Sequence, residues 1–401
     1  MSHPAWQKMW LRTHWCLGLF VGFVFVLSGV TGSTLVFYQA IDEWLNPERL
    51  IVAGSGPYRS FDEMVAAARA ARQDLIGPDD LLMPVDGHGV VVAEFRSPAE
   101  RPHRFHTIEV TIDPYTATVL SHDRVWGDTF VSVLYEVHRG WLLEETGETL
   151  VGICGLLLLL SVGTGLYLWW PKAGRGRQAI TFNPNGSTIR RCYDLHKLSG
   201  VVGSIVLLVL AFTGLYLEFP DYFIALVEIV SPVSEEVTWH STVSQEARPI
   251  TVDHAVAIAK ERFPTAELKW IGLPQHADDV VQIGLRQPEE VRRTSGESIV
   301  RLDQYNGAVL GVRDWRLLAG GTTFLAWLFP LHNGEALGII GRIIVFVTGF
   351  VPLILYVTGV RMWWLKRVAR RRQKQAPEVG MTRISINASP TSEERLTVSH
   401  R

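Results

Sequence analysis

Four long apolar runs constrain the fold of this chain more than any other feature. An α-helix rises 1.5 Å per residue, so about 20 apolar residues cross the roughly 30 Å hydrocarbon core of a bilayer. The runs cover residues 15–37, 150–170, 198–219 and, approximately, 337–364. Lys8 and Arg12 precede the first run, but it has no small-x-small cleavage site. We therefore interpret it as an uncleaved membrane helix and not as a signal peptide.

The composition agrees with a membrane protein. Charged residues make up 19% of the chain and the residues AVILMFWYC make up 47%, whereas charged residues form about 25% of an average soluble domain. The formal net charge of −2 excludes a globally basic protein that binds nucleic acid. A lipid bilayer is thus an expected partner, and nucleic acid is not.

The orientation is predicted from basic residues in the short segments. Lys8 and Arg12 precede the first run. The segment between the second and third runs and the segment after the fourth are also basic, with Lys172, Arg175, Arg177, Arg190 and Arg191 in one and Lys366, Arg367, Arg370, Arg371, Arg372 and Lys374 in the other. The positive-inside rule places all three segments, and both termini, in the cytoplasm. The long stretches 38–137 and 220–331 are then external.

An internal repeat relates the two halves of the chain. Each apolar run contains a Thr-Gly pair near its end, and the four pairs begin at Thr31, Thr164, Thr213 and Thr358. His14 precedes Thr31 by 17 residues, and His196 precedes Thr213 by 17. His138 precedes Thr164 by 26 residues, and His332 precedes Thr358 by 26. These equal spacings predict a tandem duplication of a unit made of helix, external domain and helix.

The external stretches repeat as well. Residues 60–72 and 252–263 have helical periodicity. Alternating segments follow at 89–95, 106–112, 280–285 and 298–302. Turn residues after Asp113 and Asp303 separate two apolar runs in each half. We expect two small α+β domains, each with one helix against a few antiparallel strands.

The four repeated histidines are the candidate functional residues. By the predicted topology, His14 and His196 lie on the cytoplasmic side, and His138 and His332 lie on the external side. A single histidine at a membrane boundary is most often an interfacial or structural side chain, but two symmetric pairs favour a cofactor metal between helices. Zinc is disfavoured because neither pair is accompanied by Cys, Asp or Glu at a spacing that would complete a tetrahedral site. A bis-histidine haem needs only two imidazoles, so we predict two b-type haems forming an electron path across the membrane.

Other residues near these histidines have two open interpretations. Arg342 lies inside the fourth run, where a charge must face protein, a polar ligand or the interface. It could pair with a haem propionate, as could Arg12, Arg139 and Lys197, for which snorkelling to the interface is the alternative. The Thr-Gly pairs suit close helix packing, with the hydroxyl bonded to its own helix, or the lining of a haem pocket.

Several sequence motifs resemble those of one known family. They are Arg12-Thr-His14-x-x-x-Gly18, Leu195-His196-Lys197, the His-x-Gly phrases at His138 and His332, and Thr-Gly-Leu-Tyr-Leu-Trp-Trp-Pro at the end of the second run. Together they are similar to the PepSY-associated transmembrane family over nearly the whole chain, to about residue 372. The resemblance implies PepSY-like external domains and a bacterial inner membrane. Members include di-haem reductases that release iron from ferric siderophores on the periplasmic side. One departure is Gly147-Glu148 before the second run, where the family commonly has Gly-Arg; Gly341-Arg342 keeps that pattern.

The expected fold class is a membrane α-helical bundle of four transmembrane helices in tandem duplication, with two periplasmic α+β PepSY-like domains. The predicted division is 1–37 N-terminus and first helix, 38–125 first domain, 126–170 re-entrant segment and second helix, 171–197 cytoplasmic loop, 198–219 third helix, 220–320 second domain, 321–365 re-entrant segment and fourth helix, and 366–401 basic tail, disordered from about residue 376.

The expected function is a transmembrane oxidoreductase. Electrons would pass from an unidentified cytoplasmic or membrane donor to the haem at His14 and His196, then to the haem at His138 and His332, and finally to a ferric siderophore, with no catalytic residue beyond the haem ligands. Two alternatives stay open: a haem-free accessory or permease component of iron–siderophore uptake, and a regulatory protein whose PepSY domains bind peptides or inhibit a protease. The visible spectrum of the purified protein would distinguish them.

Overall fold

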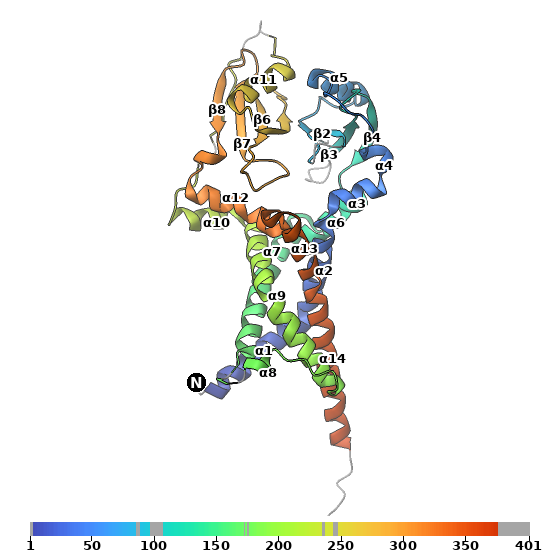
Figure 1. Cartoon of the computed structure of the whole chain (residues 1–401), viewed down its shortest axis with the longest axis vertical. Helices are drawn as coiled ribbons and strands as arrows, with labels where there is room; N and C mark the ends of the chain where they lie inside the picture. The colour runs from blue at the N-terminus through green and yellow to red at the C-terminus, as the bar shows by residue number, and fades with distance from the viewer. Residues whose placement is uncertain are drawn as a thin grey trace, which may run out of the picture.

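A computed structural model describes residues 3–85, 89–96, 107–171, 173–174, 176–234, 237–243 and 248–375. The molecule is a helical bundle with a β-sheet domain at one end (Figure 1). Three helices are long and apolar enough to cross a membrane, or four if a bent pair of helices counts as one span. The chain is therefore a membrane helical bundle with a separate β-containing domain.

Each membrane span extends beyond its predicted apolar run at one end. The helices of the spans are α1 (His3–Phe20), α2 (Gly22–Leu35), α7 (Glu144–Trp169), α9 (Thr188–Glu218), α13 (Gly338–Thr348) and α14 (Val351–Gln375). The third helix was expected from residue 198 but begins at Thr188, where the Ser187 hydroxyl accepts a hydrogen bond from the Arg190 amide. Hydropathy marks the part of a helix that suits hydrocarbon, whereas backbone hydrogen bonding continues into the polar flanks. His196 consequently lies on α9 and not in a loop.

Two of the spans are interrupted. The helices α1 and α2 meet at an angle of 58° at Val21, and α1 slants away from the bundle at its lower end (Figure 1). The fourth span breaks between α13 and α14, at Gly349 and Phe350. There α2 packs on the fourth span, and the Ser33 hydroxyl donates to the Phe346 carbonyl over 2.8 Å. A small polar residue on α2 thus satisfies a carbonyl beside the break.

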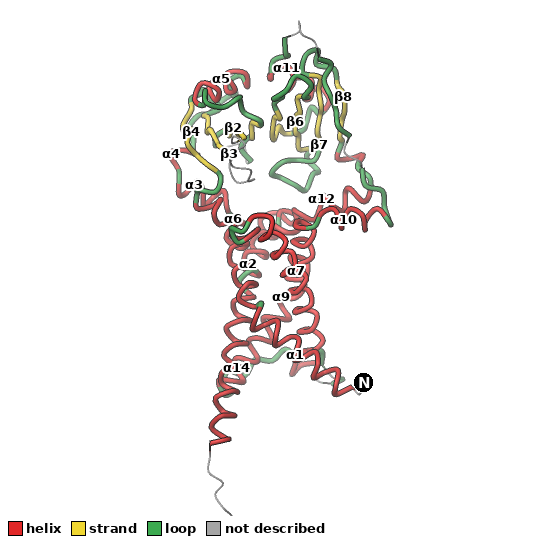
Figure 2. Tube along the Cα trace, turned by 180° about the vertical axis from the view of Figure 1, so that it is seen from behind, coloured by secondary structure: helices red, strands yellow, loops and turns green. Residues whose placement is uncertain are grey.

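Short helices lie between the bundle and the β domain (Figure 2). They are α3 (Tyr38–Leu45), α4 (Pro47–Leu50) and α6 (Phe130–Gly140) in the first half, and α10 (Pro220–Glu228), η1 (Trp315–Leu317), α12 (Gly320–Asn333) and η2 (Glu335–Leu337) in the second. A further short helix, α8 (Gly176–Ala179), follows α7. The helices α6 and α12 lie where the sequence predicted re-entrant segments before the second and fourth spans, and they carry His138 and His332.

The two halves of the β domain share one eight-stranded antiparallel sheet, in the order β4-β3-β2-β1-β5-β6-β7-β8. The strands are β1 (Asp80–Leu82), β2 (Val91–Arg96), β3 (Thr107–Ile112), β4 (Val119–Val125), β5 (Glu267–Gly272), β6 (Val280–Arg286), β7 (Ser298–Asp303) and β8 (Val309–Arg313). The halves join where β1 pairs with β5, with Leu81 opposite Ile271. The sequence predicted two separate small domains, and this edge-to-edge pairing makes them continuous.

The helices α5 (Phe61–Ala71) and α11 (Val252–Arg262) cover the buried face of the sheet. Alternate residues of each strand point to this face, as strand geometry requires. In β2, for example, Val91, Ala93 and Phe95 are fully buried, whereas Val92 and Glu94 between them are less so. Side chains from both halves form a single hydrophobic core.

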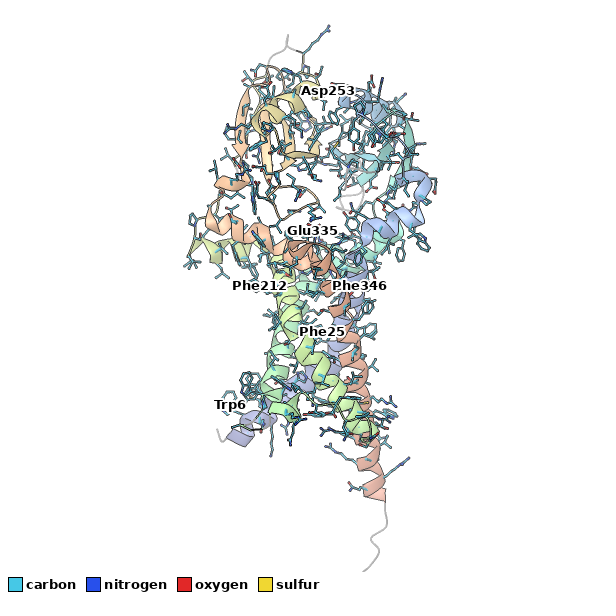
Figure 3. The ribbon with its side chains drawn as sticks, in the orientation of Figure 1. Trp6, Phe25, Phe212, Asp253, Glu335 and Phe346 are labelled. Atoms are coloured by element: carbon cyan, nitrogen blue, oxygen red, sulfur yellow. The ribbon has the colours of Figure 1, made fainter. Side chains whose placement is uncertain are left out.

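A reciprocal pair of aspartates joins α5 to α11 (Asp253 is labelled in Figure 3). The Asp253 carboxylate accepts hydrogen bonds from the Ser60 hydroxyl, the Phe61 amide at 3.1 Å and the Asp62 amide at 3.3 Å. The Asp62 carboxylate accepts in turn from the Val252 amide at 3.0 Å and the Asp253 amide at 3.2 Å. Each helix thus satisfies the free amides at the start of the other.

We expect Asp253→Asn to loosen this junction. Burial alone would raise the pKa of the Asp253 carboxyl, but the hydrogen bonds from Ser60, Phe61 and Asp62 outweigh burial and hold the pKa below its ordinary value. The stabilisation is therefore present above the pKa of the unfolded chain and is lost as pH falls through the lowered value. Hydrogen exchange of the α5 and α11 amide groups at neutral pH should become about ten-fold faster or more, since a hydrogen bond to a charged group contributes about 1.5–3 kcal/mol.

The control is Asp74→Asn, which removes an exposed ion pair with Arg72 and should change exchange little. The difference in hydrogen-exchange rate between Asp253→Asn and the native chain should become smaller at acid pH. A difference that grows as pH falls would contradict this assignment.

Candidate functional site: two histidine pairs

The fold brings the four repeated histidines together as two pairs. His14 on α1 and His196 on α9 have ring centres 6.1 Å apart. His138 on α6 and His332 on α12 have ring centres 6.2 Å apart. We call His138 and His332 the domain-side pair, because α6 and α12 lie beneath the β domain (Figure 1). His14 and His196, towards the end of the bundle where α14 leaves it, are the tail-side pair.

In the first half, each histidine is held by the Thr-Gly pair of the other span. The Nδ1 atom of His14 lies 3.1 Å from the Thr164 hydroxyl and 3.1 Å from the Ser161 carbonyl on α7. The Nδ1 atom of His138 lies 3.1 Å from the Thr31 hydroxyl and 3.0 Å from the Ser28 carbonyl on α2. The second span therefore orients His14 of the first, and the first span orients His138 on α6, at opposite ends of the bundle.

The second half repeats this arrangement. The Nδ1 atom of His196 lies 3.0 Å from both the Thr358 hydroxyl and the Leu355 carbonyl on α14. The Nδ1 atom of His332 lies 2.9 Å from the Thr213 hydroxyl on α9. The duplication seen in the sequence therefore extends to the atoms that position each ring.

These contacts determine which ring nitrogen carries the proton. Each threonine hydroxyl already donates to a carbonyl of its own helix, from Thr31 to Leu27 at 2.7 Å, Thr164 to Ser161 at 2.9 Å, Thr213 to Val209 at 2.7 Å and Thr358 to Ile354 at 2.6 Å. The hydroxyl oxygen can then only accept from the imidazole, and a backbone carbonyl can only accept as well. Nδ1 is the protonated nitrogen, so the lone pair of Nε2 is free. Metal-binding histidines are oriented in this way by a hydrogen bond from the other nitrogen.

The glycine after three of the four threonines makes room for a histidine ring. A side chain at Gly32 would place its Cβ atom 2.7 Å from Cε1 of His138, so the ring would have to move from its position. The corresponding distances of 3.1 Å from Gly165 to His14 and 3.1 Å from Gly214 to His332 are also tight, whereas 3.5 Å from Gly359 to His196 is an ordinary van der Waals contact. The sequence suggested helix packing or a pocket lining for the Thr-Gly pairs. In the structure the threonine bonds to its own helix and also contacts a histidine.

The spacing of the rings suits one metal ion between each pair. A metal–nitrogen bond is about 2.0 Å and the nitrogen is about 1.1 Å from the ring centre, so two imidazoles on opposite sides of one ion have centres about 6 Å apart. Both observed distances, 6.1 and 6.2 Å, agree with this value. With Nδ1 bonded to the protein, the donor set offered by each pair is two imidazole Nε2 atoms. This donor set fits the axial ligands of a haem iron.

The basic residues near the histidines differ in their partners. Arg139 forms an ion pair with Glu148 at 3.2 Å, and Lys197 forms one with Asp194 at 3.1 Å. The Arg342 guanidinium donates to the Val36 carbonyl at 2.5 and 3.1 Å and lies 4.9 Å from the centre of the Phe37 ring. Within the described ranges no carboxylate pairs with Arg342. Of these three cations, Arg342 is the one left to receive an anionic group.

A second polar cluster lies in the β domain. Asp79, Asp80, Glu94, Phe95, Arg96 and Thr107 line a cavity of about 110 Å³. Burial, followed by repulsion from neighbouring carboxylates, raises the pKa of Glu94 to about 7 and that of Asp80 to about 6. In the part of the chain that the structure describes, no group of three or more His, Cys, Asp or Glu side chains is arranged to hold a metal ion. The histidine pairs therefore remain the candidate site.

Comparison with known proteins adds one finding. The sequence model of one protein family, the PepSY-associated TM region, matches residues 11–366. This range contains most of the bundle, the whole β domain and all four histidines of the two pairs. Among curated proteins, no match to the chain is found.

Proposed function

The chain belongs to the PepSY-associated TM family, as its sequence phrases suggested, and from this premise we propose that it is a di-haem reductase of ferric siderophores. One haem b would be held by the tail-side pair and one by the domain-side pair. The observation that carries the proposal is the repeated geometry of two imidazoles about 6 Å apart, each with its Nδ1 proton bonded to the protein.

In this proposal the protein supplies the histidine ligands of each haem and fixes the orientation of their rings. Haem iron, when bound, supplies one-electron oxidation and reduction. Thr164 and Thr358 hold the tail-side imidazoles in one tautomer, and Thr31 and Thr213 hold the domain-side imidazoles. Arg342 offers its charge to a propionate near the domain-side pair.

The proposed direction of electron flow follows from the charges on the flanking segments. Basic residues at the tail-side end favour the cytoplasm, so the β domain would lie in the periplasm of a bacterial inner membrane. An electron from a separate donor would reach the tail-side site first and the domain-side site second. Transfer of one electron to a periplasmic ferric siderophore would yield Fe(II), which hard oxygen donors hold less tightly than Fe(III). The haem-free accessory and regulatory alternatives leave the two matched imidazole pairs without a role.

The visible spectrum of the detergent-purified chain tests this proposal. We expect close to two b-type haems per chain and a low-spin, six-coordinate spectrum in both oxidation states, because each pair provides both axial ligands. Haem is quantified as its pyridine complex against protein concentration. A colourless preparation from haem-replete cells would exclude a haem function and leave the accessory and regulatory alternatives.

A further inference from the structure

The turn that follows the domain-side histidine differs between the two halves. Residues 138–148, His-Arg-Gly-Trp-Leu-Leu-Glu-Glu-Thr-Gly-Glu, align without gaps with residues 332–342, His-Asn-Gly-Glu-Ala-Leu-Gly-Ile-Ile-Gly-Arg. In the second half, the residues with positive φ are glycines, Gly334 at 84° and Gly338 at 60°. In the first half, three residues with side chains adopt positive φ: Trp141 at 51°, Leu142 at 62° and Glu144 at 53°. Such conformations are unfavourable for L-residues and are found where the surrounding structure or a function maintains them.

Trp141 also carries an unused hydrogen-bond donor. Its Nε1 atom is buried and has no acceptor. Among the described residues, the other buried side-chain atoms without a partner all belong to the β domain, on Thr111, Arg286, Arg292 and Arg313. Buried indole N–H groups ordinarily find a partner, since an unpaired one has lost its hydrogen bonds to water. Outside the β domain, the one unpaired buried side-chain donor of the described residues therefore lies three residues after a proposed haem ligand.

The two halves of the chain differ in the charged side chains that they place near the domain-side pair. Arg342 on the second half has no carboxylate partner within the described chain and stays available to an anion. The equivalent residue of the first half is Glu148, which forms an ion pair with the Arg139 guanidinium at 3.2 Å. Because that ion pair neutralises Arg139, Arg139 is not free to receive an anionic ligand. The indole N–H of Trp141, two residues after Arg139, is buried and has no acceptor within the described chain.

We infer that Trp141 donates its indole N–H to a carboxylate of the cofactor bound between His138 and His332, which under the proposed function is a haem propionate. The strained turn at residues 141–144 holds the indole in place before the cofactor arrives. The two halves then bind the cofactor's carboxylates by different means, a guanidinium from Arg342 and an indole from Trp141. The inference rests on the proposed function.

The experiment measures transfer of haem from the full-length protein to excess apomyoglobin. Trp141→Phe keeps an aromatic ring and removes the N–H, and we expect one of the two release phases to become about ten-fold faster or more, as for loss of a hydrogen bond to a charged group. Trp44→Phe, at an exposed position on α3, should leave both phases unchanged. If Trp141→Phe does not fold, benzothienylalanine at position 141 replaces the N–H by sulfur in a ring system of nearly the same shape.

A second arm uses haem b dimethyl ester, which lacks the propionate charge. The inference requires that the substitution at position 141 accelerates release of haem b but not of the ester. Equal acceleration for both haems would overturn it, because the effect would then come from packing. Unchanged release of haem b would also overturn it while the proposed function stands. A native chain that binds no haem would overturn both.

Discussion

A chain with His332→Ala should be reduced at the tail-side haem but should lose rapid reoxidation by a ferric siderophore. A straight helix from His14 to Thr31 would be about 26 Å long at 1.5 Å per residue, and the 58° bend at Val21 shortens this only in part. The tail-side pair therefore lies far from any chelate at the β domain (Figure 1). The domain-side pair lies directly beneath that domain, so loss of the domain-side haem should remove rapid reoxidation by the ferric siderophore.

Stopped-flow absorbance after reduction by dithionite measures this step. The matched control is His276→Ala, which removes an exposed histidine of the β domain and should leave the kinetics unchanged. Fast reoxidation that survives in His332→Ala, with the domain-side haem shown to be absent, would rule out the proposed site of electron exit.

Single substitutions of the four histidines should sort into two classes of haem loss. His14→Ala and His196→Ala should each remove the same haem, because their rings form one pair at 6.1 Å. His138→Ala and His332→Ala should each remove the other haem, because their rings form the second pair at 6.2 Å. One haem takes two axial ligands, so each variant should retain about half of the haem of the native chain.

A redox titration of each variant, together with haem quantification, identifies which haem remains. The two members of a pair should leave the same midpoint potential, and the two pairs should leave different ones. If His14→Ala and His138→Ala removed the same haem, the pairing would be wrong even if the total haem content fell by half.

The sequence alone predicted the membrane bundle, because long apolar runs leave a chain few folds besides membrane helices. It also predicted the strand segments 89–95 and 280–285, whose alternation of apolar residues is a local signal, and they correspond to β2 and β6. The duplication was visible because equal spacings such as His14 to Thr31 and His196 to Thr213 need no structure to be measured. That the histidines bind haem stays a prediction.

The tertiary structure decided what depends on contacts between distant segments. The strand β1 has three residues, too few for any periodicity, yet its pairing with β5 joins the two halves of the sheet. The partner of His14 is Thr164, on another helix and 150 residues away, so spacing within one span could not identify it. The ion pair between Arg139 and Glu148 and the buried N–H of Trp141 likewise depend on how a turn closes. Hydropathy and periodicity report which face of a segment is buried, whereas these contacts depend on which neighbour buries it.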